Sequence, residues 1–367
     1  MPGNENEISV IDPNFEIKEK LGVDDVVFYD VTKEPFRLYG LYLDEGLPFR
    51  RMPEKIAESV SRGVASLNFN TAGGRVRFRT DSPYIAIKAK MPNIRLMSHM
   101  PLTGSSGFDL YEIYGNGYYY VKSFIPPKDR QDGYESLIRV NNRGKVAEYE
   151  INFPLYNRVD SLEIGLKDGS VTEKPKGYGR SGLILFYGAS SFQGGCASRP
   201  GTCCPALVSH RLDIDHLNLC FSGSAKGENE MAEYLASVKS SVFMMYYDGN
   251  AKDAAHLRNT HLNVYRKYRE KNPDTPIVMM SMARSAAFSQ DIIKRRQVIL
   301  DTYYYALDHG DFKVAFIDGI SLYSGDDSSV YTVDGVHPND AGFLRIADAV
   351  TEEVSRALNG YFPISGV

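Results

Sequence analysis

The hydrophobic pattern of this 367-residue chain changes close to residue 178. Before that point, apolar and polar side chains alternate along short segments separated by turn-forming residues, which is typical of half-buried strands. Beyond it, short continuous apolar runs alternate with longer helical segments, which is typical of parallel strands buried on both faces. The length also exceeds that of one ordinary domain. We therefore expect two domains, at residues 1–178 and 179–367.

The first half predicts an antiparallel β domain. Residues 75–79 alternate charged and apolar side chains, and segments 108–114 and 118–124 flank a Gly-Asn-Gly turn suited to a tight hairpin. Further strands are expected at 146–153 and 162–166, with one helix at 53–61. Many short strands joined by turns favour a β sandwich or a jelly roll.

The second half predicts a parallel sheet of five strands between layers of helices. The apolar runs are residues 183–187, 217–221, 242–247, 277–282 and 314–317. The helical segments are residues 205–212, 228–239, 253–271, 291–307 and 340–358. The whole chain is thus expected to be an α+β two-domain protein whose second domain is a three-layer α/β/α unit.

Charge and hydropathy exclude several partners. With 42 basic and 46 acidic side chains, the formal net charge is −4, so no excess of positive charge is available for nucleic acid or an anionic membrane. No apolar run approaches the roughly 18 residues that a membrane-spanning helix needs. We expect a soluble chain, exported if a signal peptide has been removed from it.

The four cysteines all lie between residues 196 and 220. Free buried thiols are the default expectation, and a bridge from Cys196 to Cys203 or Cys204, which requires an oxidising compartment, is the alternative. No His-x-x-x-His, Glu-x-x-His or Cys-x-x-Cys spacing occurs, so the sequence predicts no metal site and no cofactor.

Ser190 is a candidate nucleophile, because it follows the first apolar run within Gly188-Ala189-Ser190-Ser191. Ligands gather at the carboxyl ends of parallel strands, and small residues at such a junction can expose a hydroxyl together with a backbone N–H. The alternative is a turn that only connects strand to helix.

Asp334 and His337 lie together before the last helix. A serine needs a neutral imidazole to accept its proton, and the imidazole needs a carboxylate to fix its tautomer. The spacing alone is a weak signal, because Asp and His are common in turns and helix caps, and the same spacing recurs at Asp213 and His216 and at Asp253 and His256.

Gly223 and Asn250 are candidate oxyanion donors, through a backbone N–H and a side-chain amide respectively. Gly223 follows the second apolar run and Asn250 follows the third. Taken singly, one fits a loop glycine and the other a helix cap.

In this order, the candidate residues resemble the blocks that define the SGNH, or GDSL-like, hydrolase superfamily. The matching blocks are Gly188–Ser191, Ser222–Gly223, Gly249–Asn250 and Asp334–His337. Gly107-Phe108-Asp109-Leu110-Tyr111 is similar to the Gly-x-Asp-Leu-Tyr motif of the branch in which a β domain precedes the hydrolase. The resemblance implies a flavodoxin-like fold for the second domain.

The resemblance also implies a serine esterase. Ser190 would attack an ester carbonyl with His337 as base and Asp334 as its partner, and the N–H groups of Ser190 and Gly223 with the Asn250 amide would bind the oxyanion. A short acyl group, such as acetyl on a carbohydrate, fits best, because the sequence offers no long apolar lid. The expected partner is therefore a small-molecule or glycan ester.

Two alternatives stay open. One is acyl transfer, in which an alcohol replaces water at the same acyl-enzyme. The other is an inactive glycan-binding protein, supported by Ala189, which stands where the family has an aspartate. Three further features bear on the substrate: Arg199 and Arg284 could contact it or only anchor loops, and Tyr118–Tyr120 could stack on sugars or only build a hairpin.

Overall fold

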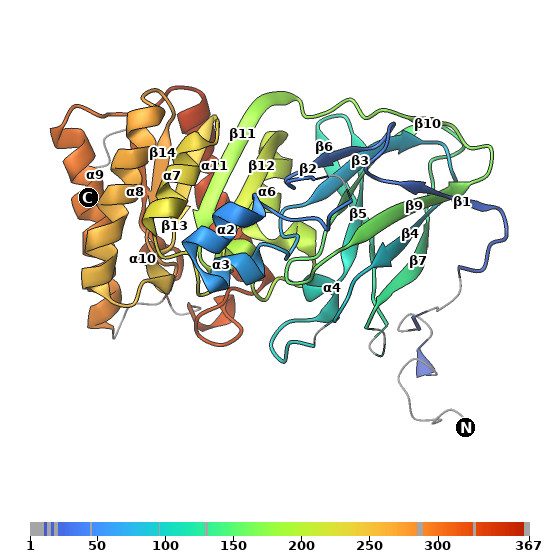
Figure 1. The fold of residues 1–367 in the computed structure, drawn as a ribbon, viewed down its shortest axis with the longest axis horizontal. Helices are drawn as coiled ribbons and strands as arrows, with labels where there is room; N and C mark the ends of the chain where they lie inside the picture. The colour runs from blue at the N-terminus through green and yellow to red at the C-terminus, as the bar shows by residue number, and fades with distance from the viewer. Residues whose placement is uncertain are drawn as a thin grey trace.

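The structure is a computed structural model. It describes residues 11–12, 16–17, 21–44, 46–94, 96–127, 129, 131–284, 289–325 and 328–362. Two units lie side by side along its longest axis, an all-β unit and an α/β unit (Figure 1). None of the described helices is long and apolar enough to cross a membrane.

The β unit is a sandwich of two antiparallel sheets, as predicted. One sheet has the order β1 (Val26–Asp30), β9 (Ser161–Lys167), β4 (Tyr84–Lys90) and β7 (Gly133–Arg139). The other has the order β10 (Thr172–Glu173), β3 (Arg75–Thr80), β8 (Ala147–Asn152), β5 (Phe108–Tyr114) and β6 (Gly117–Phe124), with β2 (Arg37–Tyr39) also paired to β3. Alternate side chains such as Val76 and Ile85 fill the core between the sheets.

The predicted hairpin is confirmed. β5 and β6 pair from Phe108 with Phe124 to Tyr114 with Gly117, and Gly115 has the positive φ of 60° that the turn requires. A register shift after Leu110 leaves one residue of β6 unpaired there. β6 therefore bulges opposite Tyr111. The Tyr111 ring packs on His210 of the α/β unit.

The α/β unit has the predicted parallel sheet of five strands. In spatial order these are β12 (Ile214–Cys220), β11 (Arg180–Gly188), β13 (Val242–Tyr246), β14 (Ile277–Met280) and β15 (Val314–Ile317). The connecting helices are α5 (Ser190–Gln193), α6 (Cys204–Leu212), α7 (Asn229–Ser237), α8 (Ala254–Lys271), α9 (Gln290–Asp308), α10 (Gly319–Leu322) and α11 (Asp340–Leu358). Three 3₁₀ turns accompany them: η2 (Pro200–Thr202), η3 (Asp248–Asn250) and η4 (Ser328–Tyr331).

Helices cover both faces of this sheet, which explains why its strands read as continuous apolar runs. Leu185 and Tyr187 of β11 share one core with α7, α8 and α9. Ile184 and Phe186, which point to the opposite face, share a second core with α6 and α11. The predicted three-layer α/β/α arrangement is confirmed.

Two helices from the first half of the chain belong to the core shared with α7, α8 and α9 rather than to the sandwich. The expected helix at 53–61 is α2 (Glu54–Val60), and α3 (Arg62–Leu67) follows it after a break at Ser61. Ala57, Val60 and Val64 are buried in the same cluster as α7, and Figure 1 shows both helices beside the α/β unit. The domain boundary at residue 178 stays a prediction, because α2 and α3 come from the first half of the chain but pack on the α/β unit.

A buried polar network holds the two units together. Arg77 Nε of β3 donates to Glu150 Oε2 at 2.7 Å, and His210 Nε2 of α6 lies 2.7 Å from Glu150 Oε1. Arg75 pairs with Asp215 of β12. Burial acts to raise the pKa of Glu150, but Arg77 and His210 outweigh it and hold the pKa well below its usual range. Each buried charge thus has an opposite charge at the seam, meaning the interface between the β unit and the α/β unit.

Candidate active site

Strand register brings the candidate residues to one edge of the parallel sheet. Gly188, at the end of β11, is level with the last residues of both β12 and β13. Ser190, Gly223 and Asn250 follow these three strand ends within a few residues. This is the carboxyl edge, where open α/β sheets place their ligands.

Ser190 is the first residue of the four-residue helix α5. Helix α5 ends at once because Gly194 adopts a φ of 109°, a conformation that favours glycine. Asn218 of β12 anchors the helix to the sheet, because its Nδ2 donates to the Phe192 carbonyl at 2.9 Å. Ser190 therefore sits on a short, firmly held turn with its hydroxyl at the sheet edge.

His337 joins Ser190 to Asp334. Its Nε2 lies 3.0 Å from Ser190 Oγ, and its Nδ1 lies 2.7 Å from Asp334 Oδ2. Ser190 and His337 are 147 positions apart in the chain, so only the fold brings them together. The side chains of His337 and Asp334 are 23% and 37% exposed, which leaves the site open to solvent.

The hydrogen bonds of Asp334 fix the tautomer of His337. Burial acts to raise the pKa of Asp334, but the backbone and imidazole N–H groups of His337 and the amide of Val336 lower it to about 2. An ionised carboxylate can only accept, so His337 Nδ1 carries the proton and Nε2 presents its lone pair to Ser190. This polarity lets Nε2 take the proton of the serine hydroxyl.

Gly223 and Asn250 are brought together and hydrogen-bond to each other. Gly223 N–H donates to Asn250 Oδ1 at 3.1 Å, while Asn250 Nδ2 donates to the Phe221 carbonyl at 2.9 Å. Both contacts would turn repulsive if the amide were reversed, so its orientation is determined. The Ser190 N–H opens α5, where no preceding turn of helix offers an acceptor. The Gly223 N–H and the Asn250 amide are thus already engaged, and the role of these three groups in binding an anionic oxygen stays a prediction.

Two family models match the chain in tandem. Residues 26–171 match the GxDLY model, the N-terminus of esterases of the SGNH-hydrolase type. Residues 182–355 match the GDSL-like lipase/acylhydrolase family. The chain belongs to this family.

Solved structures share the arrangement of both units. A structure described as a GDSL-like lipase from Bacteroides ovatus is 27% identical, with a TM-score of 0.82 over 91% of this chain and 98% of its own. A salicylyl acyltransferase, SsfX3, is 18% identical with a TM-score of 0.75, covering 94% and 100%. An acetyl xylan esterase from Butyrivibrio proteoclasticus is 11% identical with a TM-score of 0.57, covering 93% and 100%. A search of curated proteins gives no match.

In this GDSL-like protein, the Gly-x-Asp-Leu-Tyr motif anchors the loop that follows the nucleophile helix. Asp109 is fully buried and accepts hydrogen bonds from Arg199 Nη1 at 3.0 Å, Gly201 N at 2.8 Å and Asn152 Nδ2 at 2.9 Å. The Tyr111 hydroxyl also contacts Arg199. The motif thus ties the β sandwich to the loop between α5 and α6.

We expect the substitution Asp109→Ala to destabilise the protein by about 3 kcal/mol or more, because removing one partner of a buried charge pair leaves the other uncompensated. The midpoint of urea unfolding measures this. Asp274→Ala is the matched control, since Asp274 pairs with Lys313 on the surface with its side chain 87% exposed. Equal midpoints for the two variants would contradict the anchoring role.

Arg199 and Arg284, the two predicted substrate contacts, differ in their surroundings. Arg199 is held by Asp109 and Tyr111 and lies over the Tyr120 ring at 3.9 Å from its centroid, which gives it a structural role. Arg284 lies four residues beyond β14 and is partly buried. Contact of either with substrate stays a prediction.

The three consecutive tyrosines of the hairpin also differ in their surroundings. Tyr118 donates to Asp213 Oδ1 at 2.5 Å and stacks on His210 with ring centroids 4.3 Å apart, so it belongs to the seam between the units. Tyr119 and Tyr120 are 58% and 46% exposed. A sugar could therefore stack only on these last two, and that role stays a prediction.

Sequence reasoning missed residues that position the site. Gln193 accepts from Ser222 N at 2.9 Å and donates to the Leu155 carbonyl at 3.1 Å, so it links α5, the Gly223 loop and the β sandwich. Tyr156 of the sandwich donates to the Ser190 carbonyl at 3.4 Å. Gln193 lies in the Ser-Ser-Phe-Gln-Gly-Gly string beside the nucleophile, which is the one signal that could have found it.

Asp248 supports the turn that carries Asn250, although its carboxyl group is buried and only partly hydrogen-bonded. It is 2% exposed, its Oδ2 accepts from Met282 N at 2.9 Å, and its Oδ1 has no partner among the described residues. Burial raises its pKa to about 6, although the Met282 amide and Arg295 act in the opposite direction. The folded state therefore binds this proton more tightly than an unfolded chain, whose Asp pKa is about 3.9.

This sign predicts how Asp248→Asn changes stability with pH. The favourable contribution of the Asp248 proton is complete below about pH 4 and is lost as pH rises through about 6. Asparagine keeps an acceptor for Met282 without the charge. We expect it to stabilise the protein at pH 8 by up to about 3 kcal/mol and to change little at pH 4. Urea unfolding at both pH values measures this, and an equal difference at both would contradict the burial argument.

Proposed function

We propose that the protein is a serine esterase that hydrolyses short-chain acyl esters, with acetyl groups on carbohydrates as the expected class. The observation that carries the proposal is the hydrogen-bonded series Asp334 to His337 to Ser190, with distances of 2.7 and 3.0 Å. Membership of the GDSL-like lipase/acylhydrolase family supports the same reaction type.

In the proposed reaction, His337 Nε2 takes the proton of Ser190 while Oγ attacks the ester carbonyl. The resulting imidazolium is stabilised by Asp334 and returns the proton to the leaving alcohol. The acyl group is then bound to Ser190. Water, deprotonated by the same Nε2, attacks the acyl carbonyl, and the serine is restored with release of the acid.

The oxyanion of each tetrahedral intermediate would accept from the Ser190 N–H and from donors of the Gly223 loop. In the resting structure the Gly223 N–H donates to Asn250 Oδ1. It must therefore turn toward the oxyanion as the intermediate forms. Gly223 is exposed, has a φ of 64° and has no neighbour that a side chain would meet, so the loop has room for this change.

The openness of the site supports a polar substrate with a small acyl group. His337 and Asp334 are partly exposed, and the β sandwich approaches Ser190 through Tyr156. A sugar could thus contact both units while only its acyl group enters the site. Proteins of the same fold include carbohydrate esterases of family two and an acetyl xylan esterase.

A screen of esters tests the proposal. We expect the protein to cleave p-nitrophenyl acetate and acetylated sugars, with activity falling steeply as the acyl chain lengthens. Activity that rises with chain length would contradict the short-acyl assignment. No cleavage of any ester, together with no labelling of Ser190, would favour the inactive glycan binder.

Acyl transfer is the second candidate, favoured by the shared fold with the salicylyl acyltransferase. The same acyl-enzyme would pass its acyl group to a bound alcohol instead of water. Product analysis separates the two reactions: a new ester that forms in the presence of an acceptor alcohol, at the expense of free acid, would indicate a transferase.

A further inference from the structure

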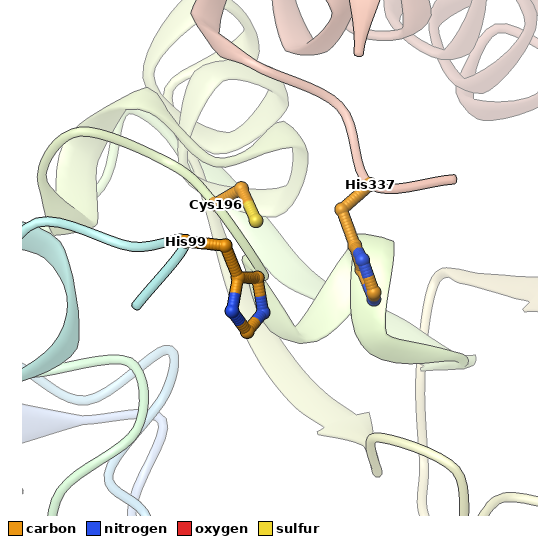
Figure 2. A group of neighbouring side chains, drawn as sticks. All are labelled: His99, Cys196 and His337. Atoms are coloured by element: carbon orange, nitrogen blue, oxygen red, sulfur yellow. The ribbon is translucent and has the colours of Figure 1, made fainter. Parts of the chain in front are cut away.

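Three metal-ligating side chains meet beside the candidate nucleophile although they are far apart in the sequence. His99 comes from a turn of the β sandwich, Cys196 from the loop after α5, and His337 from the loop before α11 (Figure 2). One ligand atom of each residue lies within 4.8 Å of the other two. Neither the reaction nor the fold accounts for His99 and Cys196 in this position.

The backbone holds Cys196 in place at some conformational cost. Its φ is 73°, a left-handed value that non-glycine residues seldom adopt, and its side chain is buried and free of any disulfide. Such outliers persist where the surrounding structure determines them. In Figure 2 the Cys196 sulfur lies above the His99 ring, and the His337 imidazole stands to the right of both.

His99 is the member of the cluster whose side chain has room to move. It is exposed, in a turn closed by the Met100 N–H to Met97 carbonyl hydrogen bond of 3.1 Å, and its ring centroid lies 5.7 Å from that of His337. Donor atoms around a tetrahedral zinc ion are about 3.3–3.8 Å apart, given bonds of about 2.0–2.3 Å. The cluster must therefore contract by about 1 Å, which side-chain rotation of an exposed histidine can supply.

We propose that His99, Cys196 and His337 form an inhibitory site for zinc or a metal ion of similar preference. Two imidazoles and one thiolate are the ligand set that such ions favour, with a fourth position left for water. Magnesium and calcium ions prefer oxygen ligands and are excluded by the same donor set. The site lies at the junction of the two units, because each unit contributes at least one ligand.

Binding would stop the proposed esterase reaction directly. His337 Nδ1 is committed to Asp334, so the metal ion must take the lone pair of Nε2, which otherwise accepts the Ser190 proton. The Cys196 thiol releases its proton to solvent as the metal–sulfur bond forms. Asp334 then orients a metal-bound imidazole, as carboxylates do in many zinc sites. Ser190 has no base while the ion is bound.

The test titrates zinc chloride into the full-length protein without thiol reductants and follows acetyl-ester cleavage. We expect inhibition that a chelator reverses and that magnesium chloride does not reproduce. His99→Ala and Cys196→Ser should keep the metal-free activity and raise the half-inhibitory zinc concentration at least about tenfold, since even outer-shell losses weaken metal sites about 10–100-fold. His309→Ala, an exposed imidazole after α9, is the matched control and should change nothing.

Direct binding separates this inference from the proposed activity on which the inhibition assay rests. Calorimetry with zinc chloride should show one site per chain, and cobalt(II) should give a sulfur-to-metal charge-transfer band that Cys196→Ser abolishes. A charge-transfer band from a protein without esterase activity would support the metal site and contradict the proposed function. No binding, or equal zinc sensitivity of wild type and the His99→Ala and Cys196→Ser variants, would overturn the metal site.

Discussion

Replacing Ser190 by alanine is expected to lower kcat/KM for acetyl esters by a factor of about 10⁴ or more. The hydroxyl is the only group at this position that His337 Nε2 can deprotonate, at 3.0 Å. Without it, no acyl-enzyme forms, and any residual hydrolysis depends on water that the remaining donors happen to orient.

Ser191→Ala is the matched control for this prediction. Ser191 is the next residue of α5, but it is buried and interacts with Tyr246 rather than with His337. We expect its loss to change kcat/KM only a few-fold. Full activity of Ser190→Ala, or equal losses in both variants, would show that the nucleophile is elsewhere.

Asp334→Asn is expected to lower kcat on the order of 10⁴-fold with little change in fold. Asp334 Oδ1 accepts the His337 and Val336 amides at 2.7 and 3.0 Å, so the asparagine oxygen must occupy this position. Its NH₂ group then faces His337 Nδ1 and donates to it. The imidazole proton moves to Nε2, which can no longer accept the proton of Ser190.

Asp253→Asn tests whether this loss reflects the tautomer rather than the sequence spacing. Asp253 has the same three-residue separation from His256, yet it accepts the His256 backbone N–H at 2.8 Å as the N-cap of α8. Its substitution should leave kcat unchanged. A loss of kcat in Asp334→Asn below tenfold would contradict the proposed role of the carboxylate.

The sequence was most informative where local pattern and tertiary role agree. The five apolar runs of the second half correspond to β11–β15, because strands buried on both faces need apolar side chains at every position. Ser190 and His337 were found because each follows a strand end or precedes a helix within a distinctive string. Asp334 could be singled out because it lies three residues before His337.

Features that depend on long-range packing were not visible. α2 looks like any amphipathic helix, and nothing in its sequence indicates that it packs on α7 rather than on the sandwich. The sequence predicted no metal site because motif spacing is local, whereas His99, Cys196 and His337 meet only through the fold. For the same reason, the role of Asp109 in holding Arg199 and Gly201 needed the structure.

Labelling with a fluorophosphonate tests the central claim, that Ser190 is activated as a nucleophile by His337, most directly. The reagent phosphonylates an activated serine whatever the natural substrate, and mass spectrometry of the digested protein locates the adduct. We predict one adduct per chain, on Ser190, that is absent from Ser190→Ala and forms far more slowly in Asp334→Asn. An unlabelled wild-type protein, or an adduct on any other residue, would contradict the account.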